Sequence, residues 1–291
     1  MPTTFEAATS IVARGHDDAG RRHYDVELVD EYAIAGTKPN GGYMLACLGR
    51  AALDAAREAG STHEHVITAS AQFLSSPDLG PAQIVTEIDR VGKTASQVNA
   101  TIGVDGVRGV RAQFTLGTLH EGTTPFWGEI ARCPFPALED LAPSPMAGER
   151  GNTLQFDPAA GFEMTENGPA AVGGGEFRAY LRDEVDDAFD TVGLLYASDV
   201  MPPATFGVVQ TGWVPTLAIT VYNRAIPAPG PLRLRFRVQV IHDGYADEIC
   251  EAWDSEDRLV MQSTQMTALR IPPDATPRTD AKSTEVVRAR G

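Results

Sequence analysis

One carboxylate stands alone in a long apolar part of the chain. Asp199 is the only charged side chain between Thr191 and Asn223. A carboxylate withdrawn from water loses solvation energy unless it gains hydrogen bonds or changes its pKa. Acids in that setting are frequent at reactive sites, where they act as general bases or orient water. Asp199 also lies near a predicted helix end, where a carboxylate can face solvent or bond to a backbone amide, and the residue type leaves both interpretations open.

Two polar residues farther along the chain could hold the same water molecule. Thr216 begins the strand predicted after the Asp199 helix, and Gln265 lies in the last predicted strand. A hydroxyl and an amide each donate and accept hydrogen bonds, so together with a carboxylate they can fix one water molecule in a defined direction. Ordinary polarity of a strand face is the alternative explanation of both residues.

Three arginines lie on one face of another predicted strand. Arg233, Arg235 and Arg237 alternate with apolar residues, which places their guanidinium groups on the same side of the sheet. Such groups bind phosphates, so this face could receive the phosphates of a nucleotide-bearing ligand. The alternative is a solvated sheet face in an acidic protein.

The sequence lacks the residue spacings that are typical of other common active sites. His63 and His65 have no Cys or His partner at a zinc-like distance along the chain. No serine elbow and no glycine-rich phosphate loop follow a predicted strand, and Cys47 has no evident base. We therefore expect no metal, no cofactor and no covalent nucleophile.

Composition narrows the classes of partner and compartment. The formal net charge of −15 argues against nucleic-acid binding, which requires clustered basic residues. Three cysteines that are far apart, and no signal-peptide pattern at the N-terminus, indicate a reducing cytoplasm. The longest apolar region, Gly193 to Val221, is interrupted by Asp199 and three prolines, so no membrane span is expected.

The elements that position these residues occur twice. The segment Pro77 to Pro81 returns 150 positions later as Pro227 to Pro231, between similar strand patterns. The last strands of the two copies carry Gln113 and Gln265, which are 152 positions apart, although the two glutamines alternate differently with their apolar neighbours. One helix followed by several antiparallel strands, repeated, indicates a doubled α+β unit. The predicted helices are 43–59 and 191–201, and the main predicted strands are 66–73, 83–89, 216–222 and 232–240.

The first predicted helix is apolar on nearly all sides, which is typical of a buried helix. Asn40 could cap it, and a sheet wrapped around such a helix is the hotdog arrangement. The predicted organisation is an N-terminal lead over 1–20, a first hotdog over 21–120, a linker over 121–175, a second hotdog over 176–271 and a flexible tail over 272–291. We expect one short strand in the linker, at Thr153 to Phe156.

Several short motifs resemble one known family. They are Pro39 to Ala46, Ala197 to Asp199, Pro215 to Leu217, Trp253 to Val260 and Ser263 to Gln265. In order and spacing they are similar to the acyl-CoA thioesterases of the bacterial thioesterase II type, which are double-hotdog proteins. The resemblance extends from about residue 20 to residue 271. It implies that Asp199, Thr216 and Gln265 bind and activate the hydrolytic water, and that the substrate is an acyl-CoA.

One departure from that family lies after Thr216. The family usually has an acidic residue two positions later, often followed by His, whereas this chain has Ala218 and Ile219. A non-catalytic protein that binds an acyl thioester is therefore the main alternative. An enoyl-thioester hydratase is a further alternative, but those families pair their acid with a histidine that has no counterpart here.

The start of the first helix is the predicted binding site of the substrate. Unpaired N–H groups and the helix dipole favour negative charge there, so Gly41 and Gly42 are candidates to stabilise an oxyanion, with Tyr43 beside them. The apolar interior next to the helices would hold the acyl chain. Uncovered sheet edges at the ends of the two units lead us to expect a homo-oligomer.

Overall fold

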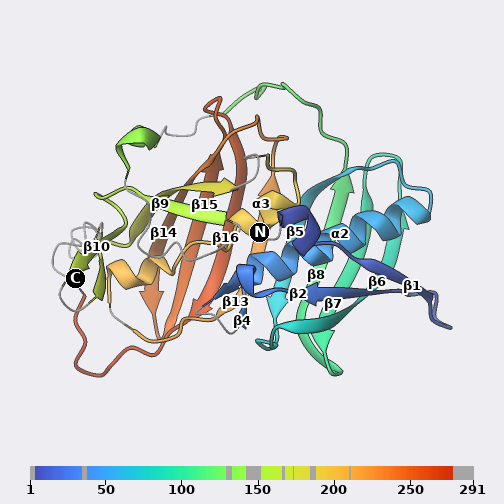
Figure 1. Ribbon diagram of the computed structural model, residues 1–291, viewed down its shortest axis with the longest axis horizontal. Helices are drawn as coiled ribbons and strands as arrows, with labels where there is room; N and C mark the ends of the chain where they lie inside the picture. The colour runs from blue at the N-terminus through green and yellow to red at the C-terminus, as the bar shows by residue number, and fades with distance from the viewer. Residues whose placement is uncertain are drawn as a thin grey trace.

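One antiparallel sheet of 12 strands crosses the whole molecule (Figure 1). The computed structural model describes residues 4–34, 38–128, 133–141, 152–165, 168–172, 174–183, 188–209 and 211–277. The strand order in the sheet is β1-β2-β6-β7-β8-β5-β13-β16-β15-β14-β12-β9. The two predicted units are thus joined edge to edge within a single sheet.

The first unit consists of a long helix and the strands around it. In Figure 1 the helix α2 lies in front of these strands. Asn40 caps the helix, because its side chain accepts a hydrogen bond from the backbone N–H of Tyr43, as predicted. Most of the helix is buried, which agrees with its apolar composition. The elements are β2 (Arg22–Leu28), α2 (Gly41–Glu58), β5 (His65–Phe73), β6 (Gly80–Val91), β7 (Ser96–Val104) and β8 (Val107–Gly117).

The second unit repeats this order with a much shorter helix. The helix predicted over 191–201 is α3, which spans only Gly193–Ala197. Its last turn tightens, since the N–H of Asp199 bonds to the carbonyl of Tyr196, and Pro202 and Pro203 then prevent continuation. The elements are β12 (Glu176–Asp183), α3, the 3-10 helix η3 (Ala204–Gly207), β13 (Thr216–Asn223), β14 (Leu232–His242), β15 (Tyr245–Trp253) and β16 (Leu259–Ala268).

Short elements surround the two units. The strand β1 (Val12–His16) forms one edge of the sheet, and β9 (Asn152–Phe156) forms the other by pairing with β12. β9 is the strand predicted between the units, whereas the hairpin of β10 (Phe162–Thr165) and β11 (Gly168–Ala171) was not predicted. The remaining elements are α1 (Phe5–Ala8), η1 (Asp30–Tyr32), β3 (Ala33–Ile34), β4 (Lys38–Pro39) and η2 (Leu138–Asp140). Residues 278–291 of the predicted tail lie outside the described residues.

An approximate two-fold axis between β5 and β13 relates the two units. Ser70 lies opposite Thr220, and these residues are 150 positions apart with their hydroxyl oxygens 3.3 Å from each other. Their neighbours pair crosswise, Ala69 with Val221 and Ala71 with Ile219. The 150-residue repeat found in the sequence is therefore confirmed as a repeat of structure.

The register of the last strands corrects the expected pairing of the two glutamines. Ser70 lies opposite Gln113 in the first unit, whereas Thr220 lies opposite Thr264 in the second. The counterpart of Gln113 is thus Thr264, and the counterpart of Gln265 is Phe114. The expected offset of 152 was wrong by one residue, which in a strand moves a side chain to the other face. Gln113 is exposed, while Gln265 is only 5% exposed.

The arginine face of β14 is occupied by carboxylates. Arg233 pairs with Asp257 at 2.6 Å, and Arg235 pairs with Glu176 at 2.9 Å. Arg237 lies 3.8 Å from Glu251. Because these guanidinium groups already have anionic partners within the chain, the described residues support an ion-paired sheet face rather than a free phosphate site.

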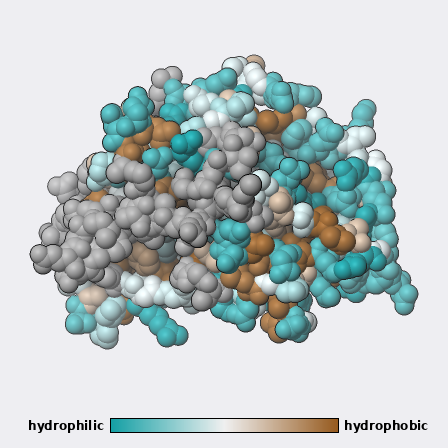
Figure 2. Space-filling view, in the orientation of Figure 1, coloured by the Kyte–Doolittle hydropathy of each residue, from teal (hydrophilic) through white to brown (hydrophobic). Residues whose placement is uncertain are grey.

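In the space-filling view, hydrophilic residues cover the rim of the first unit, and hydrophobic residues gather toward the middle of this face (Figure 2). In the part of the chain that the structure describes, no helix is long and apolar enough to cross a membrane.

Candidate active site

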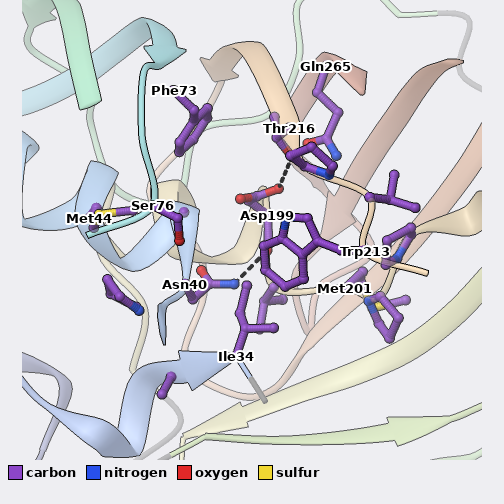
Figure 3. A pocket seen from close by; sticks show the side chains of 18 of the residues that line it. Ile34, Asn40, Met44, Phe73, Ser76, Asp199, Met201, Trp213, Thr216 and Gln265 are labelled. Carbon is purple, nitrogen blue, oxygen red and sulfur yellow. Dashed lines mark hydrogen bonds between the residues drawn. The ribbon is translucent and has the colours of Figure 1, made fainter. Parts of the chain in front are cut away.

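A cavity of about 760 Å³ lies where the start of α2 meets the end of α3 and the start of β13. Its volume is in the usual range for a small-molecule site. Most of its wall is apolar, including Met44, Phe73, Met201 and Trp213 (Figure 3). Asp199, Thr216, Gln265 and Glu248 supply polar groups to this wall. The structure therefore brings the three predicted catalytic residues together in one cavity.

Asp199 is held at the cavity from two sides. The Thr216 hydroxyl donates a hydrogen bond of 3.3 Å to Asp199 Oδ1 (Figure 3). The side-chain amide of Asn40 donates a bond of 2.8 Å to the main-chain carbonyl of Asp199. Since Asn40 caps the helix of the first unit, both units are needed to place a carboxylate that belongs to the second.

Gln265 connects Asp199 to another acid, Glu248. Its Nε2 donates a hydrogen bond of 3.1 Å to Glu248 Oε2, and its side chain also hydrogen-bonds to Asp199. Glu248 is fully buried, and its Oε1 accepts a bond of 3.3 Å from the backbone N–H of Thr205. Glu248 was not among the site residues predicted from the sequence. The signal was present, because Glu248 alternates on β15 with the inward-facing Ala246 and Cys250.

The two carboxyl groups hold protons more tightly than ordinary acids do. Burial, reinforced by the Glu248 charge, raises the pKa of Asp199 to about 7. Hydrogen bonds from Thr216, Gln265 and the backbone N–H of Gly42 oppose this rise. Burial also raises the pKa of Glu248 above its usual range. Asp199 can thus accept a proton near neutral pH.

The residues predicted to bind substrate occupy three different environments. Gly41 lines the cavity, and a Cβ atom added there would lie 2.3 Å from Asp199 Oδ2. Gly42 lies against α3, where an added Cβ would be 2.5 Å from the carbonyl oxygen of Tyr196. Tyr43 is fully buried away from the cavity, with its phenol oxygen 2.7 Å from the Ala8 carbonyl. The Tyr43 side chain stabilises the start of the helix and does not reach the cavity.

The corresponding place in the first unit is apolar. Gly49 stands 150 positions before Asp199 (199 − 49), and Val66 stands 150 positions before Thr216 (216 − 66). Phe114 replaces Gln265, and Val98, which lies opposite Phe114, replaces Glu248. A Cβ atom added at Gly49 would lie 3.8 Å from both Val66 and Phe114. Of the two equivalent places, only the one in the second unit carries reactive groups.

No group of three or more His, Cys, Asp or Glu side chains that could hold a metal is found among the described residues. Three charged side chains, Glu31, Asp199 and Glu248, are found among the described residues of the cavity wall, and all three are acidic. An uncharged ligand portion, such as an acyl chain or a thioester carbonyl, suits this wall better than an anionic portion does.

The raised pKa of Asp199 predicts a pH-dependent stability difference. Between about pH 4, the ordinary pKa of an aspartate, and about pH 7, the folded protein binds more protons at this site than the unfolded chain. Its free energy of unfolding therefore falls as pH rises through this interval. Asp199→Asn removes the effect, so its Tm relative to wild type should be higher at pH 8 than at pH 5.

Thermal unfolding at the two pH values, followed by circular dichroism, checks this expectation. Asp243→Asn is the control, because Asp243 lies in an exposed turn with φ of 49°, a conformation that asparagine also adopts. The same Tm difference from wild type at both pH values would contradict the raised pKa of Asp199.

Each of the two units matches a domain of one known protein family. Residues 29–117 match the model of an acyl-CoA thioesterase N-terminal domain, and residues 138–269 match that of an acyl-CoA thioesterase C-terminal domain. An uncharacterized protein of Mycobacterium tuberculosis is 30% identical over 269 residues, which cover 84% of this chain and 90% of the relative.

Solved structures show the same architecture. A Thermobifida fusca protein, described provisionally as a thioesterase II, has a TM-score of 0.79 and 29% identity, with 93% of this chain and 99% of that chain covered. A hot dog protein of unknown function from Alicyclobacillus acidocaldarius has a TM-score of 0.73 and 19% identity, with 92% and 98% covered. An acyl-CoA thioesterase II of Mycobacterium marinum has a TM-score of 0.63 and 16% identity, with 92% and 99% covered. The expected α+β double-hotdog fold is confirmed.

Proposed function

The chain belongs to the acyl-CoA thioesterase family, and from this premise we propose that it hydrolyses an acyl-CoA to the free acid and CoA. The observation that carries the proposal is the half-buried carboxylate of Asp199, which accepts a bond from Thr216 at the wall of a largely apolar cavity. A general base must lie within hydrogen-bond reach of the proton it removes and have a pKa near the working pH. Asp199 suits both requirements.

In the proposed reaction, water is the nucleophile. Asp199 accepts one proton from a water molecule, whose oxygen attacks the thioester carbonyl carbon and forms a tetrahedral intermediate. The carbon–sulfur bond then breaks, and the proton held by Asp199 passes to the departing sulfur, so that the products are the carboxylic acid and the CoA thiol. Thr216 and Gln265 fix the direction of approach of the water.

The substrate carbonyl is proposed to lie against the start of α2. This helix begins at Gly41 in the cavity wall, and the first N–H groups of a helix carry partial positive charge. An oxyanion at this place gains electrostatic stabilisation during the reaction. The apolar wall formed by Met44, Phe73, Met201 and Trp213 would hold the acyl chain.

The proposal is tested by measuring release of free thiol from a panel of acyl-CoA thioesters of increasing chain length. Turnover of at least part of the panel, at a rate above that of buffer, supports it. Ala218 favours the alternative of a binding protein without activity, although Ala218 is not among the residues that line the cavity. Tight acyl-CoA binding in native mass spectrometry, with no hydrolysis over hours, would select that alternative.

The rate of hydrolysis should depend on pH as the ionisation of Asp199 does. Only the carboxylate can accept a proton from water, and the pKa of Asp199 is raised to about 7. We expect kcat/KM to rise about tenfold for each pH unit below this value and to level off above it. Initial rates between pH 5 and pH 9 check the expectation, and a flat profile over this range would exclude Asp199 as the base.

A further inference from the structure

Glu248 is a buried acid that the proposed reaction does not yet use. Its side chain is fully buried on β15, and a carboxyl group in such a place loses much solvation energy. Its position in the first unit is taken by Val98, which shows that the fold itself does not require a polar group there. A role at the cavity is therefore a better explanation than a role in folding.

The hydrogen bonds of Glu248 suit a carboxylate. Its oxygens accept bonds from Gln265 Nε2 and from the backbone N–H groups of Thr205 and Ala204, all of which are donors. A side-chain amide can present either its oxygen or its nitrogen to a partner, but an ionised carboxylate can only accept. Above its pKa, which burial raises to about 7, Glu248 thus selects the orientation of Gln265 in which Nε2 points toward the acid.

This orientation determines which atom of Gln265 remains for a ligand. Gln265 is only 5% exposed and lines the cavity, and no hydrogen-bond partner of its Oε1 is found among the residues that the structure describes. A buried carbonyl oxygen without a partner is costly, so it favours a ligand that donates a hydrogen bond. A water molecule whose first proton faces Asp199 has a second proton that Oε1 can accept.

We propose that Glu248 is a positioning residue, which holds the Gln265 amide so that Oε1 orients the water molecule from which Asp199 removes a proton. The inference rests on the proposed thioester hydrolysis. Glu248 acts through Gln265 and need not touch the substrate. Its negative charge has a second effect, because it disfavours ionisation of Asp199 and so makes that carboxylate a stronger base.

The other groups around Asp199 and Glu248 do not neutralise the negative charge of these two acids. Asp247 precedes Glu248 on β15 and adds negative charge, and Glu31 lines the same cavity from η1. The buried thiol of Cys250 has a pKa raised above its usual range by burial and stays neutral. The phenols of Tyr32 and Tyr196 also line the cavity. Lys, Arg and His are absent from the described residues of its wall.

Glu248→Gln tests the proposal, since it keeps the shape of the side chain but removes the charge and the fixed acceptor. We expect kcat to fall about tenfold to a hundredfold and KM to stay within about twofold of wild type. The acidic limb of the pH–rate profile should move to lower pH, because Asp199 loses a neighbouring charge. Glu251→Gln is the matched control, as Glu251 is also buried on β15 but faces the arginines of the opposite side.

A titration of Asp199 by carbon-13 NMR separates this inference from the proposed function. If wild type releases no thiol from any acyl-CoA, the proposed function fails, and the NMR titration then tests only the coupling between Glu248 and Asp199. A lower midpoint for Asp199 in Glu248→Gln supports the coupling of the two acids. An unchanged midpoint overturns it. If wild type is active, a Glu248→Gln variant with unchanged kcat and an unchanged acidic limb of the pH–rate profile would overturn the positioning role.

Glu248→Asp keeps the proposal testable if Glu248→Gln does not fold. The shorter side chain retains the charge, but its carboxylate lies farther from Gln265. In wild type, Gln265 Nε2 lies 3.1 Å from Glu248 Oε2. We expect a loss of kcat with the acidic limb close to its wild-type position. Wild-type kcat in a folded Glu248→Asp protein would overturn the positioning role.

Discussion

Asp199→Asn is expected to reduce kcat for acyl-CoA hydrolysis about a thousandfold. Asparagine has nearly the same shape as aspartate and can keep the contact with Thr216, which in wild type bonds to Asp199 Oδ1 at 3.3 Å. It cannot accept a proton from water at neutral pH. The expected loss is therefore one of chemistry, and KM should change much less than kcat.

The measurement is thiol release at saturating acyl-CoA, with Asp243→Asn as control for a change of charge elsewhere. Asp243 is exposed in the turn between β14 and β15, so its substitution should leave kcat unchanged. Circular dichroism and native mass spectrometry of acyl-CoA binding establish that Asp199→Asn is folded and still binds. Wild-type turnover by a folded Asp199→Asn protein would defeat the assigned role of this residue.

Gly41→Ala should have the second-largest effect, with a fall in kcat of about a hundredfold. The added methyl carbon would be placed 2.3 Å from Asp199 Oδ2 and 2.7 Å from the ring of Phe73. Both distances are below van der Waals contact, so the carboxylate must move away from the start of α2. A displacement of about 1 Å is enough to misalign a general base and its water.

Gly49→Ala is the matched control for this prediction. It changes the same residue type in the same helix, but the closest atom to its added methyl group is the end of the Leu195 side chain, which can rotate. We expect Gly49→Ala to cost about 1–3 kcal/mol of stability at most, with kcat near that of wild type. Equal kcat values for Gly41→Ala and wild type would show that the carboxylate does not depend on this close approach.

The division of labour between the two units explains why a single chain contains both. The second unit supplies Asp199, Thr216, Gln265 and Glu248, while the first supplies Asn40 and the start of α2. In the equivalent place of the first unit, Gly49 and its apolar neighbours leave room for Leu195. One half of the duplication thus supplies the reactive groups, and the other half supplies Asn40 and the helix start against which they are held.

Much of this architecture was predictable from local patterns. The 150-residue repeat, the buried helix α2 with its Asn40 cap and the strand β9 were all expected from the sequence. These features depend on periodicity, capping and turn residues, which act over a few positions along the chain. The isolation of Asp199 in an apolar stretch was equally visible, because the cost of burying a charge does not depend on the details of the fold.

The tertiary structure decided what depends on register and on contacts between distant segments. Whether Gln265 or Thr264 faces the cavity changes with a one-residue shift, and the pairing of β16 with β13 sets that shift. Glu248 became a candidate only when β15 placed it opposite Gln265. Local patterns specify which residues tend to be buried, but the chain must close on itself before two carboxyl groups 49 positions apart (248 − 199) share one amide.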